Sequence, residues 1–155
     1  ILDAQALEMH ALIHRALIPF TYRIRQAGGT LQTHLSASSS RVRGDAIHLE
    51  NVLYNVLDNA LKYTDSAPVV RVYTENEKGF LRVRVCDEGI GIPKEEWNLV
   101  FEKFYRVDSP GMPVTGGIGL GLNYVKMIME MHGGGARIAN QTGSGTCLEL
   151  WLPTE

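Results

Sequence analysis

The stretch VVRVYTENEKGFLRVRVCDEGIGI, residues 69–92, contains two segments in which apolar and polar residues alternate. Because the side chains of a strand point alternately to its two faces, this pattern predicts strands over Val69–Thr74 and Phe80–Asp87. Residues 76–79 between them, Asn-Glu-Lys-Gly, have the composition of a turn. Together they predict an antiparallel hairpin.

Asp87 ends the second of these strands, in phase with the apolar residues that face the core. A carboxylate that points inward is costly unless donors reach it. The glycine-rich residues 88–92, EGIGI, would let a ligand come close to it. The alternative is an aspartate that caps this turn by accepting hydrogen bonds from its own backbone. The core-facing phase makes this alternative less favourable than it is for an ordinary Asp-Gly turn.

Outward from the hairpin, helical and strand patterns follow one another without strict alternation. The expected elements are a helix over residues 2–18 that stops at Pro19, a strand over 30–35, a polar loop over 36–40, a central helix with Asp45 as its N-cap, a short helix over 93–100, a helix over 118–132 closed by three glycines, and a final hairpin of strands 136–140 and 146–152. Helices interrupted by hairpins favour an α/β fold of the α+β kind. We therefore expect a two-layer sandwich, with helices packed on one face of a mixed, mostly antiparallel sheet.

Composition restricts the class of protein. The 155 residues, 45% of them hydrophobic, suit one globular domain, with residues 1–30 as an N-terminal helix and lead-in. A net charge of −2 gives no basic surface that would grip nucleic acid, so none is expected as a partner. Cys86 and Cys147 are too few for a disulfide scaffold and lack metal-ligand spacing, which favours a reducing compartment, the cytosol. No apolar run is long enough to span a membrane, and a start at Ile1 indicates a piece of a longer chain.

The expected central helix carries a polar stripe. Asn55, Asn59 and Lys62 lie at i, i+4 and i+7, and Tyr63 follows. Asparagine is a mediocre helix former, so two of them one turn apart need partners, and a hard cation bound to phosphates would be one. The alternative is a pair of amides bonded to neighbouring backbone.

Residues 116–122, GGIGLGL, stand where the helix over 118–132 begins. Free N–H groups and the helix dipole attract an anion at such a point, and glycines let it approach. A dinucleotide fingerprint is disfavoured because the glycine spacing differs and because Pro110 and Pro113 precede it where that motif has a strand. The alternative is a tight helix entry without a ligand.

Taken in series, these segments resemble the motifs of bacterial sensor histidine kinases. NVLDNALKYT (55–64) resembles the N box, DEGIGI (87–92) the first glycine box, FEKFYR (101–106) the F box, GGIGLGL (116–122) the second glycine box, and GSGT (143–146) a last, shorter glycine motif. The resemblance covers about residues 45–152 in the family's order. It implies the catalytic, ATP-binding domain, with the Bergerat ATP-binding fold shared with type II topoisomerases, mismatch-repair ATPases and heat-shock chaperones.

The resemblance also implies residue roles, with ATP and Mg²⁺ as cofactors. Asp87 would accept a hydrogen bond from the adenine amine, Asn59 would bind Mg²⁺ with Asn55 nearby, and Lys62 would contact phosphate. Asn55, Asn59 and Lys62 would form the catalytic set. The other residues implied in nucleotide binding are Tyr63, Gly89, Gly91, Ile92, Phe104, Arg106, Gly117, Ile118, Gly119, Leu120, Gly121, Leu122 and Thr146. Residues of about 107–116 would form the ATP lid, with Phe101 and Phe104 anchoring its stem.

The family transfers the γ-phosphate to a histidine that an acidic residue follows, on a separate helical-hairpin domain. None of the five histidines here has that neighbour. The phosphoacceptor domain is therefore expected elsewhere in the same protein, and a response regulator as the downstream partner. The whole protein is expected to be a homodimer and a membrane-anchored receptor, of which this is a cytoplasmic part.

Two other functions compete with the kinase. ATPases of the superfamily carry a water-activating glutamate one turn before the magnesium asparagine, and here Asn55 stands there. An amide cannot accept a proton at neutral pH, so hydrolysis lacks its base. A degenerate module that binds a partner and no nucleotide is disfavoured by the intact Asp87, Asn59 and glycine boxes.

Overall fold

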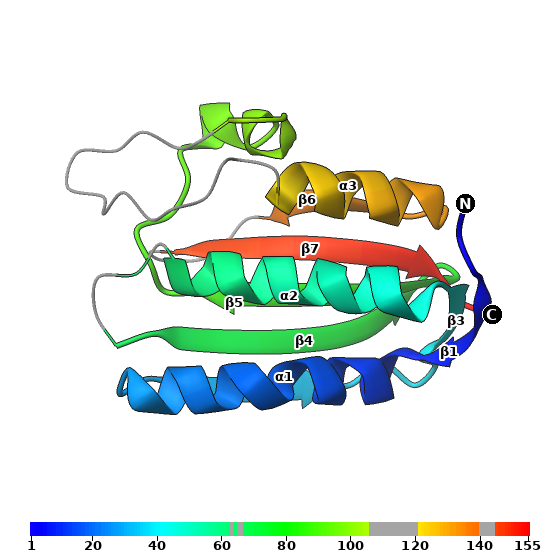
Figure 1. The fold of residues 1–155 in the computed structure, drawn as a ribbon, viewed down its shortest axis with the longest axis horizontal. Helices are drawn as coiled ribbons and strands as arrows, with labels where there is room; N and C mark the ends of the chain where they lie inside the picture. The colour runs from blue at the N-terminus through cyan, green and yellow to red at the C-terminus, as the bar shows by residue number, and fades with distance from the viewer. Residues whose placement is uncertain (63, 65–66, 106–120, 140–144) are drawn as a thin grey trace.

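The computed structural model describes residues 1–62, 64, 67–105, 121–139 and 145–155. A five-stranded sheet forms one layer, and three helices lie against one face of it (Figure 1). The strand order is β2-β4-β5-β7-β6, with bounds β2 Thr30–Leu35, β4 Val69–Glu77, β5 Phe80–Asp87, β6 Gly135–Ala139 and β7 Thr146–Pro153. The helices are α1 Met9–Gln26, α2 Ala46–Lys62 and α3 Gly121–Met131.

The sheet is mixed. β2 pairs with β4 in parallel, whereas β4 with β5, β5 with β7 and β6 with β7 are antiparallel. The expected two-layer α+β architecture is therefore confirmed, and so are the strand over residues 30–35 and both hairpins. The first hairpin turns at Lys78 and Gly79, whose φ angles of 50° and 83° match the type I′ turn that such a connection prefers.

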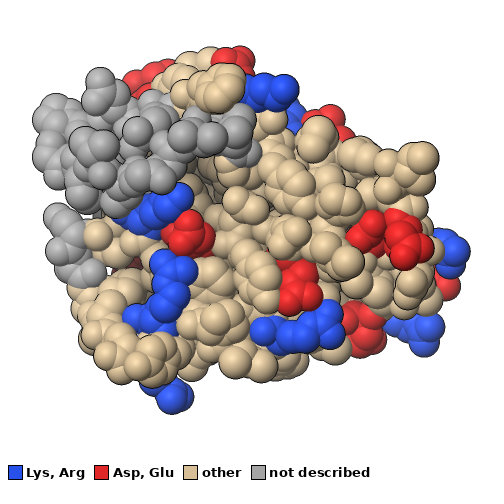
Figure 2. Space-filling model, viewed as in Figure 1, with Lys and Arg blue, Asp and Glu red and all other residues tan. Residues whose placement is uncertain are grey.

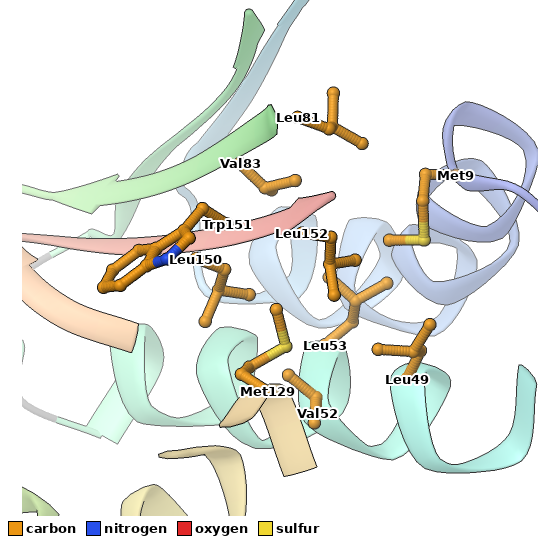
Figure 3. A pocket seen from close by; sticks show the side chains of 10 residues that line it. All are labelled: Met9, Leu49, Val52, Leu53, Leu81, Val83, Met129, Leu150, Trp151 and Leu152. Atoms are coloured by element: carbon orange, nitrogen blue, oxygen red, sulfur yellow. The ribbon is translucent and has the colours of Figure 1, made fainter. Parts of the chain in front are cut away.

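The core lies between the helices and the inward side of the sheet. Leu81, Val83 and Val85 of β5 are at most 3% exposed and alternate with the outward Arg82 and Arg84. At one end of the core, side chains from α1, α2, α3, β5 and β7 surround a void of about 10 Å³ (Figure 3). That volume is at the lower limit for one water, and its lining is apolar, so we expect it to stay dry.

The start of α2 is as predicted. Asp45 Oδ1 accepts from the backbone N–H groups of Ile47 and His48, at 3.1 and 3.2 Å. These bonds satisfy two of the N–H groups that a helix leaves free at its start, which makes Asp45 a true N-cap. They also lower the pKa of Asp45, together with a larger contribution from the backbone N–H of Asp3.

The N-terminal helix differs from the prediction. Residues 5–8 form β1 (Gln5–Glu8), which pairs with β3 (Arg41–Gly44), and the helix begins only at Met9. Pro19 lies inside the helix instead of ending it. The cost of the missing N–H is offset because Phe20 and Ile24, beyond the proline, are 5% and 1% exposed and complete the buried face.

Two further elements correct the expectations. The short helix over residues 93–100 is divided into two 3₁₀ turns, Lys94–Glu96 and Leu99–Phe101. Cys86 and Cys147, which their number and spacing left unpaired, form a disulfide with a Cα–Cα distance of 4.0 Å. The strand register explains this pairing, because the two residues lie directly opposite each other in β5 and β7.

Acidic and basic side chains are interspersed on the helical side of the molecule (Figure 2). Two of the ion pairs join α1 to α2: Arg15 to Glu50 at 3.3 Å and Arg23 to Asp58 at 3.1 Å. Both pairs are largely exposed, so each stabilises the fold by roughly 0 to 1 kcal/mol. Among the described residues, no helix is both long enough and apolar enough to cross a membrane.

Candidate functional site

The predicted site residues that the structure describes gather at one end of the sandwich. The end of β5, the start of β7, the end of α2 and the start of α3 meet there, away from the two chain termini (Figure 1). These ends bring together Asp87, Thr146, the Asn55–Lys62 stripe and Gly121. Four segments that are far apart in the sequence thus supply one site.

Asp87 is the buried carboxylate of this end. It is 9% exposed, and this burial raises its pKa to about 6, while hydrogen bonds from the backbone N–H groups of Gly89 and Thr146 act in the lowering direction. The Gly89 bond, at 2.9 Å to Oδ1, is the turn-capping bond of the alternative interpretation. The carboxylate is therefore both core-facing and turn-capping, and its acceptor atoms lie in a poorly hydrated place.

The glycines after β5 allow a close approach of two backbone segments. Gly91 has φ +80°, and a Cβ added there would lie 3.2 Å from the carbonyl oxygen of Gly145. Any side chain at Gly91 would therefore be strained and would press on the segment that leads into β7. Ile92 is held beside it, because its carbonyl accepts from Trp97 Nε1 at 2.8 Å.

Asn55 joins the stripe on α2 to the start of α3. Its Nδ2 donates to the Asn51 carbonyl at 2.8 Å, so the alternative of an amide bonded to its own helix holds for this group. Its Oδ1 faces α3: a Cβ added at Gly121 would lie 2.9 Å from that oxygen. The glycine at the first position of α3 thus leaves room for the Asn55 amide, which would have to shift if a side chain stood there.

The other two residues of the stripe differ from Asn55. Within the part of the chain that the structure describes, no hydrogen bond engages the Asn59 amide, so its oxygen is open to a ligand. Lys62 pairs with Asp58 at 3.1 Å, and Asp58 also pairs with Arg23 at the same distance. To contact a phosphate, the Lys62 ammonium would have to leave Asp58.

The aromatic residues before the expected lid have different environments. Phe101 is 5% exposed, and its carbonyl accepts from Asn123 Nδ2 at 3.1 Å, which ties it to α3. Phe104 is 69% exposed with φ +64°, so the expectation that it anchors a stem by packing is wrong. Tyr105 donates to Glu96, and this bond raises the pKa of Tyr105 to about 12. Asn123 and Trp97 donate hydrogen bonds to backbone carbonyls of this region. No pattern in the sequence predicted these two contacts, apart from the presence of polar N–H groups.

Several predicted residues lie outside the described residues: Tyr63, Arg106, Gly117, Ile118, Gly119, Leu120 and the lid over residues 107–116. Gly89, Ile92, Leu122 and Thr146 lie within them, on the same end of the molecule as Asp87 or at the start of α3. Over the residues that can be described, no three His, Cys, Asp or Glu side chains gather as a metal site.

The fold and this site define a class: ATPase domains in which helices cover one face of a mixed sheet and a buried aspartate ends a strand beside a glycine-rich turn. Residues 44–155 match the family described as "Histidine kinase-, DNA gyrase B-, and HSP90-like ATPase". The chain belongs to this family. It is an ATP-binding domain of the histidine kinase type.

Individual relatives point the same way. The chain is 36% identical over 154 residues to the sensor protein RprX of Bacteroides fragilis (strain YCH46), which covers 98% of the chain and 30% of that protein. It is 35% identical over 147 residues to the methanogenesis regulatory histidine kinase FilI of Methanothrix harundinacea (strain 6Ac), covering 92% of the chain and 16% of FilI. The chain thus spans less than a third of these relatives.

Solved structures match over the full length. A mycobacterial sensor histidine kinase, MprB, superimposes with a TM-score of 0.79 at 30% identity and covers 100% of this chain and 99% of its own. The catalytic domain of the histidine kinase ThkA gives a TM-score of 0.84 at 24% identity, with 97% of each chain covered, which supports the fold.

Proposed function

We propose that this domain binds Mg-ATP and donates the γ-phosphate to a histidine on a separate phosphoacceptor domain of the same protein. The observation that supports it most strongly is Asp87, a carboxylate 9% exposed at the end of β5, held by two backbone N–H groups. Burying a carboxylate costs free energy of desolvation. A role in accepting a hydrogen bond from the amine of a ligand explains why the buried carboxylate is present.

The adenine end of the site is built on Asp87 and the turn after it. The ionised carboxyl accepts from the exocyclic amine of adenine, in a position where water competes poorly. The resemblance of the turn to the first glycine box implies that Gly91 lies close to the base, and the missing side chain also lets Gly91 approach the Gly145 backbone. The resemblance of residues 55–64 to the N box implies that Tyr63 packs on the base.

The phosphate end is built on α2 and the start of α3. Mg²⁺, when bound, neutralises phosphate charge and orients the γ-phosphate. The open Asn59 amide oxygen fits a hard cation that prefers oxygen ligands, and a neutral amide suffices because the triphosphate brings the charge. Asn55 stands between this amide and the first turn of α3, whose N–H groups attract an anion. Lys62 contacts phosphate after leaving Asp58.

Transfer is favoured over hydrolysis by the residue at position 55. The Asn55 amide carries no lone pair that takes a proton from water at neutral pH. Asp58 is the nearest acid on α2, but it pairs with both Arg23 and Lys62 at 3.1 Å and is tied to the α1 side. The site therefore positions phosphates for a nucleophile that a partner brings.

The partners follow from the class of kinase. The histidine kinase ThkA has been solved in complex with the response regulator protein TrrA. We infer a helical-hairpin phosphoacceptor domain and a response regulator as partners of the whole protein, a homodimer as its assembly, and a membrane-anchored receptor that carries this domain on the cytoplasmic side.

Titration with ATP and with ADP, each with and without Mg²⁺, tests binding directly. The proposal expects saturable binding of both nucleotides and tighter binding of ATP with the metal. Transfer is tested by adding a histidine-bearing helical hairpin from the whole protein and measuring acid-labile phosphohistidine. Binding of a protein partner with no nucleotide binding at all would favour the degenerate module instead.

A further inference from the structure

The Cys86–Cys147 disulfide lies beside the last rung of the β5–β7 ladder. The pairing of these strands ends with Asp87 opposite Thr146, and the two cysteines form the rung before it. Pairing frays most easily at the end of a ladder, where a residue has a neighbour on one side only. The covalent bond therefore clamps the point at which the two strands would separate first.

The clamp and the nucleotide site share backbone on opposite faces of the sheet. Side chains alternate along a strand, so Cys86 faces away from the helices while Asp87 faces toward them. On β7, Cys147 follows Thr146, whose backbone N–H donates to the Asp87 carboxyl. The disulfide thus holds the donor of Thr146 in reach of Asp87.

The disulfide lies on the face of the sheet that no described helix covers. The cysteines are 4% and 3% exposed, and their cross-strand neighbours are Arg71 on β4 and Ala139 on β6. Arg71 pairs with Glu88 at 3.4 Å, with side chains 31% and 46% exposed. No described helix covers this face, and the ion pair of the neighbouring Arg71 is a weak surface pair.

We propose that Cys86 and Cys147 are a redox-reversible pair whose oxidised form raises the affinity of the nucleotide site. This inference rests on the proposed function, because the affected group is Asp87. A dithiol reductant supplies the two electrons. One reagent thiolate attacks a cysteine Sγ, the S–S bond breaks, and the other Sγ leaves as a thiolate and takes a proton. The second reagent thiol then resolves the mixed disulfide, which leaves two protein thiols and an oxidised reagent.

Reduction lets the last rung open. Without the covalent bond, only backbone pairing and side-chain packing hold Thr146 opposite Asp87. The disulfide then also no longer restrains Gly145, the residue before Thr146, in its position beside Gly91. A carboxylate that loses a backbone donor in a buried place is a poorer fixed acceptor for adenine. Reoxidation by a disulfide reagent, such as oxidised glutathione, restores the clamp by the reverse exchange.

The test compares the 155-residue chain in its oxidised form and after reduction with a dithiol, with the thiol count measured in each state. ADP affinity is measured by calorimetry, and hydrogen exchange of the Thr146 amide by NMR. We expect ADP to bind on the order of tenfold more weakly after reduction, and the Thr146 amide to exchange at least several-fold faster. Reoxidation should reverse both changes.

The Cys86→Ala/Cys147→Ala variant is the control, because its ADP affinity should not respond to the reductant. Equal ADP affinity in both states, or equal Thr146 exchange, would overturn the redox inference even if reduction lowers the melting temperature, since a merely structural disulfide predicts that result. Absence of ADP binding in both states would overturn the proposed function. Thr146 exchange reports on the clamp without nucleotide, so the two failures are distinguishable.

Discussion

Thr146 lies directly opposite Asp87 in the β5–β7 ladder, and its backbone N–H donates to the Asp87 carboxyl. A second backbone N–H, that of Gly89, donates to Oδ1 at 2.9 Å. Both donors stabilise the ionised carboxyl, yet burial outweighs them and the pKa of Asp87 is raised to about 6. The group is therefore ionised at neutral pH but close enough to its pKa to respond to mild acid.

Asp87→Asn should abolish tight nucleotide binding while the domain stays folded. The amide keeps one acceptor and can present its NH₂ to the adenine amine, which costs about 2 to 3 kcal/mol for a charge-assisted bond. Calorimetry with ADP and circular dichroism measure binding and folding. The exposed Asp3→Asn, at the other end of the molecule, is the matched control. Near-normal ADP affinity in folded Asp87→Asn would contradict the adenine role.

Nucleotide affinity should fall as the pH is lowered through about 6, because the Asp87 carboxyl becomes protonated there. The measurement is ADP affinity at several pH values between about 5 and 8, for the parent chain and for Asp87→Asn. Phosphate groups of the nucleotide titrate in the same range, and the variant reports that contribution alone. Superimposable pH profiles for the two proteins would show that Asp87 does not titrate in the binding step.

Stability should change with pH in the opposite direction. The pKa of Asp87 is raised from its ordinary 3.8 to about 6, so the folded state binds more protons than the unfolded state between these values. The free energy of unfolding contributed by this group is therefore greatest below about pH 4 and is lost as the pH rises through 6. The loss is about 3 kcal/mol at most. Denaturant melts of the parent and of Asp87→Asn at several pH values isolate this contribution. The prediction is contradicted if the free energy of unfolding depends on pH equally in the two proteins.

Asn59→Ala should reduce the effect of Mg²⁺ on ATP binding more than it reduces binding itself, since the contacts of the base remain. The amide oxygen is open among the described residues, whereas that of Asn55 faces Gly121. ATP titrations with and without Mg²⁺ measure the difference. Asn51→Ala, at an exposed position two turns earlier on α2, is the control. If Asn59→Ala responds to the metal as the parent does, another residue holds it.

The contrast between predicted and unpredicted features has a physical cause. The hairpin, the Asp45 cap and the inward phase of Asp87 depend on periods and side chains local in the sequence, and all of them are present in the fold. Pro19 inside α1 and the β1–β3 pair depend on contacts between distant segments, which override local preference. The Cys86–Cys147 bond depends on strand register, which spacing in the sequence does not encode.

The candidate site shows the same division. Residue types and motif order predicted which chain segments would meet, and the ends of β5, β7, α2 and α3 do meet. They did not predict the ion pair of Lys62 with Asp58, the exposure of Phe104, or the Asn123 bond to the Phe101 carbonyl. Each of these features depends on the orientation of a side chain relative to a neighbouring element. The periodicity of apolar residues does not predict such orientations.

The isolated domain should hydrolyse ATP very slowly yet phosphorylate a histidine on the missing helical hairpin. No carboxylate stands at position 55 to activate water, and none of the five histidines precedes an acidic residue. Hydrolysis is measured as phosphate release by the chain alone, and transfer as phosphohistidine on the hairpin. Linking the hairpin to the domain should restore transfer more strongly than mixing, because the linker raises its effective concentration. Robust Mg²⁺-dependent hydrolysis by these 155 residues alone, abolished by Asn55→Ala, would favour an ATPase instead.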